Sequence, residues 1–189
     1  MSSISGLLTD EEIIRELTKS DNKSLYDLLY RRYHRKVLDK CFSFVRDRRL
    51  AEELTEDVFS KTYEKLTSFK QQSKFSSWLY AITYNHCIDY LREKKKINYP
   101  EWNNQNEIPE IIDETEPQLS AINYENLLDI LELIHPEEKA LLMMKYLDDL
   151  SIKDISRALR ISENAAKMRL KRARTRVFYL YSDKFLKEL

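Results

Sequence analysis

A single glycine, Gly6, occurs in a chain of 189 residues, where average usage would place roughly 13. Phosphate-binding loops, dinucleotide-binding fingerprints and the nucleophile elbow of serine hydrolases all need glycines at fixed offsets, so sites of these kinds are excluded. Tight turns between β-strands would also be hard to build from this composition. Because 42% of the residues are hydrophobic and 34% are charged, we expect a helical chain with a modest core and a highly charged surface.

The cysteines and histidines give no sign of a metal site. Cys41 and Cys87 stand apart, without a C-x-x-C pair, which argues against a zinc site or a disulfide framework. His34, His86 and His135 are scattered and are interpreted as surface or packing residues. We therefore expect free thiols and no cofactor.

Membrane and export signals are also missing from the sequence. No apolar run approaches the roughly 20 residues that a membrane span needs. The first residues lack the basic start and the apolar stretch of a signal peptide. We expect a cytoplasmic protein.

Sequence signals predict four helices within residues 1–96. Thr9 and Glu12 form a capping-box pair ahead of the first helix. Asp47 is expected to open the third helix, which reaches about residue 66, and a fourth helix is expected over residues 75–94. The second helix is expected to begin at Asp21 or Asn22 and to direct inward Leu25, Leu28, Leu29, Val37, Cys41, Phe44 and Val45.

Residues 97–118 differ in composition from the segments on either side. Three of the four prolines and six acidic residues fall in this segment, which has no basic residue and no helical periodicity. Such a composition is typical of a linker between folded units. Two interpretations are open: a plain tether, or a negatively charged segment that enters a basic channel of a partner.

Helical periodicity returns after the linker. One amphipathic helix is expected over residues 119–134, and Pro136 suits the first turn of the next. Ser151 and Asp154 form a capping-box-like start for a short helix, and Ser162 is placed to cap a long final helix. The short helix, the three-residue connection from Arg160 and the final helix have the spacing of a helix-turn-helix.

The final helix has a one-sided charge pattern. Between Arg160 and Arg176 seven basic residues face one acidic residue, Glu163. A solvated surface helix usually mixes both signs of charge along i,i+4 pairs. A narrow apolar stripe is formed by Ala166, Leu170, Ala173 and Val177.

A helix held by one apolar stripe and basic elsewhere suits the major groove of DNA, where it meets phosphates and base edges. Its binding should weaken steeply with salt, since each neutralised phosphate releases counterions. The sequence thus predicts an all-α protein of two small domains. A four-helix domain spans 1–96, an acidic linker spans 97–118, and a helix-turn-helix domain spans 119–189.

Three segments of the chain resemble bacterial RNA polymerase sigma factors, and the extracytoplasmic-function (ECF) type in particular. Residues 150–177, LSIKDISRALRISENAAKMRLKRARTRV, resemble the C-terminal DNA-binding region of these proteins. Residues 48–66, RRLAEELTEDVFSKTYEKL, resemble their region 2.2 helix, and residues 75–95, FSSWLYAITYNHCIDYLREKK, resemble their promoter-melting helix. The order of the segments and the acidic linker agree, and the resemblance covers about residues 22–180. It implies a promoter-specificity subunit and not an enzyme.

The resemblance also implies contact residues for the polymerase. The region 2.2 helix of such proteins docks on a coiled coil of the polymerase β′ clamp, and an acidic face with an apolar centre suits a basic partner. The matching positions are Glu53, Leu54, Glu56, Asp57 and Phe59.

Contacts to the downstream, −10 promoter element are implied for the loop over residues 68–77 and for the helix after it. Amides can read a base edge, and lysines can hold the backbone of the strand. The positions are Phe69, Lys70, Gln71, Gln72, Lys74, Asn85 and Arg92. Trp78 either stacks on unpaired bases or packs in the core.

Contacts to the upstream, −35 element are implied for the final helix. Lys167, Met168 and Lys171 match positions that face bases, whereas Arg169, Arg172 and Arg174 suit phosphates. Arg160 replaces the usual turn glycine, and a left-handed conformation there would cost roughly 1 kcal/mol. The whole set is Arg160, Asn164, Lys167, Met168, Arg169, Lys171, Arg172 and Arg174.

The partners implied are core RNA polymerase, through its β′ clamp and β subunit, and promoter DNA. Relatives of this type are often held inactive by an anti-sigma factor, in many cases membrane-anchored, and no small-molecule substrate is expected. One alternative is a stand-alone helix-turn-helix regulator that binds an operator as a dimer. Another is a helical adaptor that binds only proteins.

Overall fold

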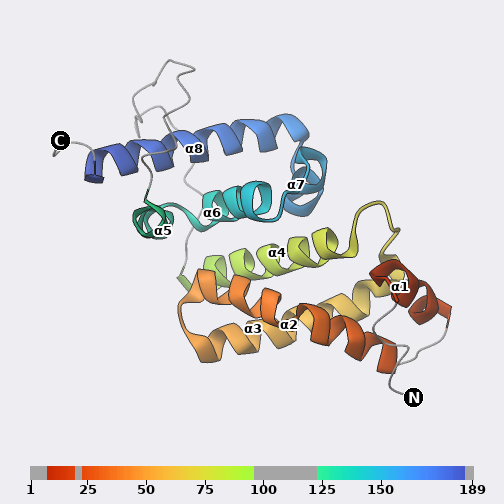
Figure 1. Cartoon of the computed structure of the whole chain (residues 1–189). Helices are drawn as coiled ribbons and strands as arrows, with labels where there is room; N and C mark the ends of the chain where they lie inside the picture. Colours follow the sequence, from red (N-terminus) through yellow and green to blue (C-terminus); the bar gives the residue numbers. More distant parts are fainter. Residues whose placement is uncertain (1–7, 20–22, 96–122, 186–189) are drawn as a thin grey trace.

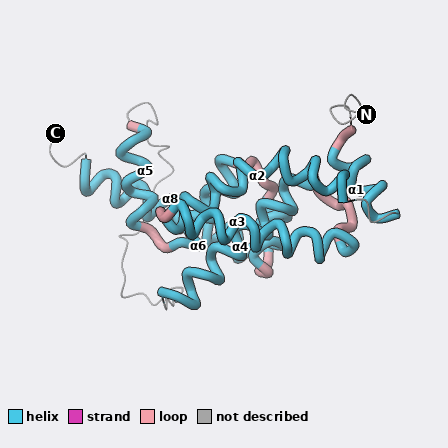
Figure 2. The backbone as a smooth tube through the Cα atoms, turned by 90° about the horizontal axis from the view of Figure 1, so that it is seen from below, coloured by secondary structure: helices cyan, strands magenta, loops and turns pink. Residues whose placement is uncertain are grey.

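The computed structural model describes residues 8–19, 23–95 and 123–185, and every regular element in these ranges is helical (Figures 1 and 2). The N-terminal half contains α1 (Asp10–Lys19), α2 (Lys23–Val45), α3 (Arg48–Lys65) and α4 (Phe75–Lys95). The C-terminal half contains α5 (Tyr124–Leu133), α6 (Pro136–Leu142), α7 (Ile152–Leu159) and α8 (Glu163–Phe185). The expected all-α class is confirmed. Within the described ranges, no helix combines the length and the apolar character that crossing a membrane requires.

Two short turns extend these helices. A 3₁₀ turn, η1 (Leu66–Ser68), follows α3, and a π-helical turn, η3 (Met143–Leu147), follows α6. The expected linker over 97–118 and the expected cap at residues 21 and 22 lie outside the described residues.

The predicted starts of α1, α3, α7 and α8 are found where the sequence places them, whereas α5, expected over residues 119–134, is capped by Asn123 and begins at Tyr124. Thr9 and Glu12 bond reciprocally at the start of α1, with 3.2 Å from the Glu12 amide to Thr9 Oγ1. Asp47 accepts from a first-turn amide of α3 at 2.9 Å. Ser151 and Ser162 cap α7 and α8, each at 3.1 Å from a backbone amide. Side-chain acceptors therefore satisfy amide groups that a helix start leaves unpaired.

The inward face of α2 agrees with the sequence pattern in its centre and differs at its ends. Leu29, Val37, Cys41 and Phe44 are buried, as expected. Leu25, Leu28 and Val45 are only partly buried and pack against the outside of the core cluster. The Sγ atoms of Cys41 and Cys87 lie 3.7 Å apart as free thiols in this core.

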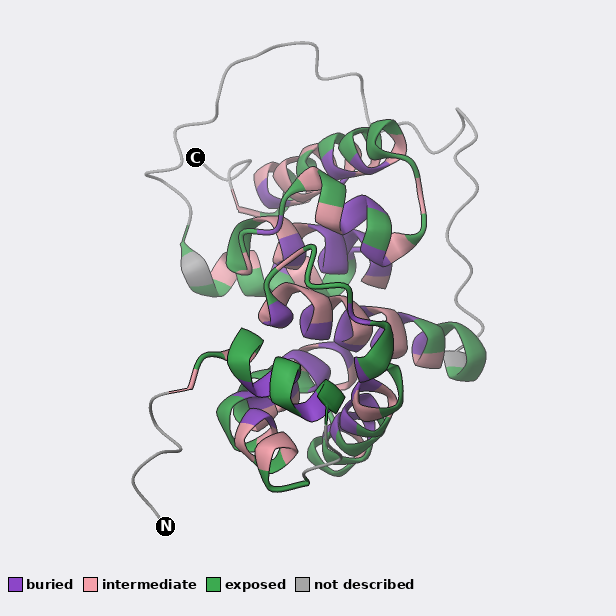
Figure 3. Ribbon diagram, turned by 90° about the vertical axis from the view of Figure 1, so that its right-hand side faces the viewer, coloured by how far each residue is buried: buried purple, intermediate pink, exposed green. Residues whose placement is uncertain are grey.

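The two halves share one continuous core. The buried cluster extends from Ile13 in α1 through α4 to Leu170 in α8. Helix α4 contacts α6 and α7, and it runs along the boundary between the two bundles (Figure 1). Figure 3 shows buried segments in both halves and where they meet. The helices predicted from the sequence do not by themselves show that the two halves pack together.

The turn between α7 and α8 has the expected left-handed residue. Arg160 adopts φ 54° and ψ 44°, a conformation that glycine takes without steric cost. Its backbone amide lies within bonding distance of the carbonyls of Arg157 and Ser156, so it ends α7. The strain is confined to one residue, and it turns the chain into α8.

Candidate functional site

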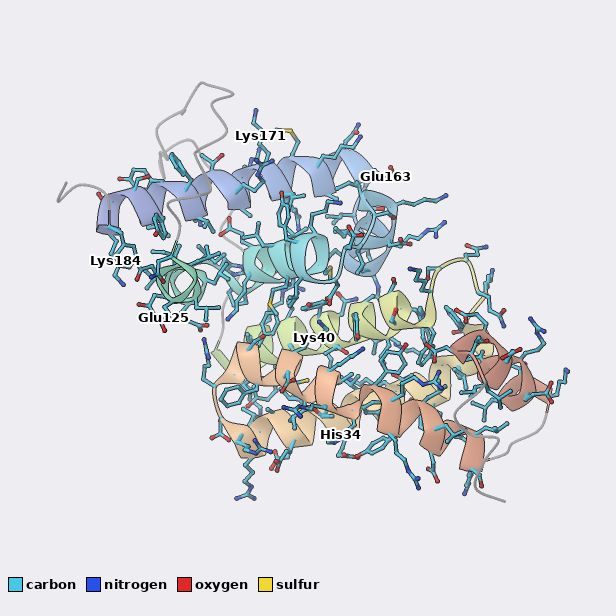
Figure 4. The ribbon with its side chains drawn as sticks, in the orientation of Figure 1. His34, Lys40, Glu125, Glu163, Lys171 and Lys184 are labelled. Carbon is cyan, nitrogen blue, oxygen red and sulfur yellow. The ribbon has the colours of Figure 1, made fainter. Side chains whose placement is uncertain are left out.

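Helix α8 presents a basic face to solvent. Lys167 and Lys171 are exposed, and the Met168 side chain between them is 50% exposed. Figure 4 shows Lys171 pointing away from the N-terminal half. The other members of the expected upstream set that are exposed are Arg160, Asn164 and Arg174.

The opposite side of α8 is held by apolar contacts. Ala166, Leu170 and Ala173 of the expected stripe are buried, and Val177 is partly buried. Helix α8 packs against α5, α6 and α7. The packing therefore fixes which side of α8 remains exposed to solvent.

Some of the arginines of α8 are neutralised by α6. Arg169 Nη1 lies 3.4 Å from Glu137 Oε2, and Arg176 Nη1 lies 3.3 Å from Glu138 Oε2. Burial raises the pKa of Glu138, while the nearby Arg176 opposes that rise. Charge counting along α8 alone misses these partners, because the acids come from another helix. Arg169, expected at a phosphate, is ion-paired and partly buried in this structure.

The loop before α4 displays the expected polar side chains but not its aromatic one. Lys70, Gln71, Gln72 and Lys74 are exposed. Phe69, in contrast, is buried, because its ring packs 4.8 Å from the ring of Trp78 and 6.0 Å from that of Phe75. Phe69 therefore packs mainly in the core and anchors the loop, and it also lines the groove beside α4. Its contact with DNA stays a prediction.

Trp78 has features of both roles that the sequence leaves open, packing in the core and stacking on unpaired bases. Its ring packs on Phe69 and Phe75, yet it remains partly exposed. It also lines an open groove of about 360 Å³ between the loop, α4 and α7. Lys70, Gln72 and Asn85 share this groove with Arg157 of α7. Amides and cations thus surround a hollow with an aromatic wall, a combination suited to an unpaired base.

The two expected DNA contacts on α4 touch the C-terminal half. The Asn85 side-chain amide donates to the backbone carbonyl of Ala158 at 2.5 Å. Arg92 is exposed and forms ion pairs with Asp89, at 3.5 Å, and with the buried carboxylate of Glu137. These interactions use atoms that the resemblance assigns to DNA.

The expected polymerase-docking face divides into surface acids and core residues. Glu53, Glu56 and Asp57 are exposed on α3. Leu54 and Phe59 are buried, at 3% and 4% exposure, because they point into the bundle. The side chains at the expected apolar centre of this face are therefore almost inaccessible to solvent, and those that are exposed are acidic. Polymerase docking through this face stays a prediction.

Neighbouring side chains fix the positions of two of these acids. The Tyr30 hydroxyl donates to Glu56 at 2.6 Å, and burial together with this carboxylate raises the pKa of Tyr30 to about 12. Asp57 lies 3.3 Å from His86 Nε2. Side chains from α2 and α4 therefore help to hold the acidic residues of α3 in place.

Sequence reasoning missed a buried charged contact at the junction. Lys40 Nζ lies 2.6 Å from Asp148 Oδ1, and the Tyr84 hydroxyl donates to Asp148 Oδ2 at 2.6 Å. The side chains of Lys40 and Asp148 are 8% and 6% exposed. One signal was available, since Lys40 lies between Val37 and Phe44 on the inward face of α2 and a charge there needs a partner.

Within the described residues, no group of three or more histidine, cysteine or acidic side chains is placed to hold a metal ion. His135 instead accepts from the Glu137 amide at 3.2 Å and caps α6.

Comparison with known proteins gives two family matches. Residues 29–97 match the model for Sigma-70 region 2, and residues 124–177 match the model for Sigma-70, region 4. Among curated proteins, the chain is 25% identical over 150 residues to the ECF RNA polymerase sigma factor SigX of Bacillus subtilis, covering 75% of this chain and 76% of SigX. It is 26% identical over 174 residues to SigW of the same organism, covering 85% and 90%.

Two solved structures share the fold. The sigma factor RpoE, solved with the anti-sigma factor NepR from Bartonella quintana, aligns with a TM-score of 0.58 at 18% identity, covering 84% of this chain and 98% of that one. CnrH, solved with the cytosolic domain of CnrY, aligns with a TM-score of 0.63 at 15% identity, covering 93% and 98%. The matches extend through both halves of the chain.

Proposed function

The chain belongs to the ECF family of RNA polymerase sigma factors, and from this premise we propose that it binds core RNA polymerase and reads a two-part promoter with separate surfaces. Sigma factors direct promoter-specific initiation of transcription. The observation that carries the assignment of surfaces is the placement of exposed basic side chains on α8 and of exposed amides and lysines around the groove beside α4.

Helix α8 reads the upstream element in duplex form. Its apolar stripe is largely buried and the helix packs against α5, α6 and α7, which leaves Lys167, Met168 and Lys171 to face base edges. Arg174 is free of the α6 carboxylates named above and suits a phosphate. Each phosphate contact of this kind adds to the salt dependence of binding.

The loop before α4 and the groove beside it hold unpaired bases of the downstream element. Unstacking a base requires a few kcal/mol, which stacking and hydrogen bonds in the groove offset. Gln71 and Gln72 supply amides, Lys70 and Lys74 supply charge for the strand backbone, and Trp78 supplies an aromatic surface.

The acidic face of α3 docks on the polymerase. Glu53, Glu56 and Asp57 form an exposed cluster that suits a basic β′ surface. The C-terminal half contacts the β subunit. The larger assembly supplies affinity that the isolated chain lacks and holds the two halves at promoter spacing.

The chain acts as a binding subunit in the cytoplasm and not as an enzyme, and it needs no small-molecule substrate. An anti-sigma factor is a further partner. Two proteins of the same fold were solved with such partners or with a partner's cytosolic domain, and a membrane-anchored partner would fit the second case.

Reconstitution tests the proposal. The purified chain is mixed with core polymerase and genomic DNA fragments, and transcript starts are sequenced. We expect transcripts that start downstream of one shared two-part sequence and that depend on the added chain. Tight binding to a duplex operator without polymerase, and no polymerase-dependent starts, would instead identify a stand-alone regulator.

A further inference from the structure

Two free thiols face each other in the core of the N-terminal half. Cys87 Sγ of α4 lies 3.7 Å from Cys41 Sγ of α2, and both side chains are 0% exposed. They are the two cysteines of the chain, and neither belongs to the surfaces proposed for DNA or polymerase. Because the sulfurs are already in contact, only a small movement separates them from the bonding distance of a disulfide, about 2.05 Å.

The two thiols differ in acidity. The Cys87 thiol donates to the Cys41 sulfur, and this hydrogen bond lowers the pKa of Cys41, although burial opposes the change. The same hydrogen bond, together with burial, raises the pKa of Cys87. Since the thiolate is the reactive form of cysteine, Cys41 is the nucleophile of the pair, and Cys87 is the thiol that can react with it next.

We propose that this pair is a modification site at which a small peroxide converts Cys41 and Cys87 into a reversible disulfide between α2 and α4. The Cys41 thiolate attacks one oxygen of hydrogen peroxide and the O–O bond breaks, so that hydroxide leaves and takes up the proton that Cys41 released. The Cys87 thiol then attacks the sulfur of the Cys41 sulfenic acid, the S–O bond breaks, and a second water leaves with the Cys87 proton. Two electrons pass from the sulfurs to the peroxide.

Burial of the pair determines which oxidants reach it. Hydrogen peroxide is little larger than a water molecule, so a small local opening between α2 and α4 admits it. Glutathione disulfide is far bulkier and must bring a sulfur into line with the attacking thiolate, which requires a much wider opening of the same helices. Burial also keeps the sulfenic acid beside the Cys87 thiol and away from further peroxide, which favours the reversible disulfide over the irreversible acids.

Helix α4 connects the thiol pair to the groove proposed for an unpaired base. The side of α4 that lines the groove carries Trp78, Ala81, Ile82 and Asn85. Cys87 follows Asn85 by two residues, about 200° around the helix, and is buried where α4 packs against α2. A bond to Cys41 therefore draws α4 away from the groove, so the oxidised chain should open less promoter DNA. This consequence rests on the proposed function, because it takes Asn85 as a base contact, whereas formation of the disulfide does not.

Oxidation of the full chain before assembly tests both parts of the proposal. The purified chain is treated with hydrogen peroxide, the peroxide is removed, and core polymerase is added afterwards, so that the cysteines of the polymerase stay reduced. Intact mass and alkylation of the unfolded chain report the free thiols, and a proteolytic peptide that joins Cys41 to Cys87 identifies the bond. Cys41→Ala and Cys87→Ala are matched controls, since each variant keeps a single thiol and cannot form a disulfide within the chain.

We expect peroxide to remove both free thiols of the parent chain together with the mass of two hydrogen atoms, and dithiothreitol to restore them. Glutathione disulfide at the same concentration should leave both thiols free. Promoter opening by the holoenzyme, measured by permanganate reactivity, should fall at least about fivefold after oxidation, as expected for the loss of one base contact. Dithiothreitol should restore the opening, and peroxide should not change it in the two alanine variants.

Thiols that stay free after peroxide, or a sulfinic acid on Cys41 in place of the bond, would overturn the modification site. Equally fast cross-linking by glutathione disulfide would overturn the choice of oxidant, and a disulfide that leaves promoter opening unchanged would overturn the link through α4. Dithiothreitol does not reduce oxidised methionine, so recovery of the parent chain identifies the disulfide even where an alanine variant fails to fold. Failure of the proposed function shows separately, as a reduced parent chain that opens no promoter with polymerase whatever the mass measurement shows.

Discussion

The side-chain amide of Asn85 in α4 donates to the backbone carbonyl of Ala158 in α7, at a distance of 2.5 Å, and so joins the two halves of the chain. The groove proposed for an unpaired base lies directly beside this bond and is lined by both residues. One amide therefore has two competing uses: it stabilises the association of the halves, or it binds a base of the opened strand.

Replacing Asn85 should separate these uses. With Asn85→Ala, we expect holoenzyme to lose about 1–3 kcal/mol of the discrimination that favours its promoter over a mismatched sequence, and to open less DNA. Permanganate reactivity of unpaired thymines measures the opening. Asn126→Ala removes a similar amide from α5 and serves as the control. Equal opening by both variants would remove Asn85 from the downstream site.

Charge reversal on α8 tests upstream recognition. Lys171 is exposed and points away from the N-terminal half (Figure 4), so Lys171→Glu should leave the fold intact and place a carboxylate against the major groove. We expect promoter binding by the holoenzyme to fall at least about tenfold, and the salt dependence of binding to weaken by about one counterion. Lys184→Glu reverses a charge at the far end of the same helix, and we expect little change there. Unchanged promoter binding by Lys171→Glu would refute its assigned role.

Two residues of the expected polymerase-docking face should respond differently to substitution, because the structure buries one and exposes the other. Leu54 is buried, so Leu54→Ala should lower the free energy of unfolding by about 2–5 kcal/mol. Glu53 is exposed, so Glu53→Lys should change stability by less than about 0.5 kcal/mol and weaken binding to core polymerase. Urea unfolding measures the first effect and co-elution with polymerase the second. A stable Leu54→Ala chain with weakened polymerase binding would return Leu54 to the docking surface.

Local signals in the sequence located most helices correctly. Capping residues such as Asp47 and Ser162 act within one turn of the chain, so their effect can be read from neighbours in sequence. The stripe of α8 is equally local, because i,i+3 and i,i+4 spacing determines which side chains share a face. The helix-turn-helix and its exposed basic side were predictable for this reason.

Contacts between distant segments were not predictable in the same way. Phe69 lies in a polar loop, and nothing nearby in sequence shows that Trp78 and Phe75 would enclose its ring. The sequence of α8 does not show that Arg169 has an acidic partner, because Glu137 comes from another helix. Lys40 and Asp148 are separated by most of the chain. Composition reveals such charges but not their partners.

The turn at Arg160 offers a gain of stability with a built-in control. A residue with a Cβ in the left-handed region costs roughly 1 kcal/mol or more, and glycine avoids that cost. Arg160→Gly should therefore raise the free energy of unfolding by about 1 kcal/mol relative to Arg160→Ala, which keeps the strain. Both variants lose the same guanidinium, so they should lose the same affinity for promoter DNA. Thermal unfolding of the two variants measures the difference in stability, and a DNA-binding assay checks that their affinities are equal. Equal stability of the two variants would show that the left-handed conformation at residue 160 does not carry this cost.

The last prediction concerns acid sensitivity at His86. Burial lowers the pKa of His86 below its ordinary value of 6.5, and the ammonium of Lys61 adds to this, while Asp57 opposes it. A group whose pKa is lower in the folded chain contributes stability above its unfolded pKa, and this contribution is lost as pH falls through 6.5 toward the folded value.

We therefore expect the free energy of unfolding to decrease between about pH 7.5 and about pH 5.5, a range in which histidines titrate and most carboxylates do not. His86→Gln removes the titrating group and should flatten this dependence, whereas His34→Gln, on the surface of α2, should preserve the part due to His86. Urea unfolding at several pH values gives the slopes. A slope that persists in His86→Gln would assign the acid sensitivity to another group. A slope of opposite sign in the parent chain would mean that the ion pair with Asp57, at 3.3 Å, outweighs burial.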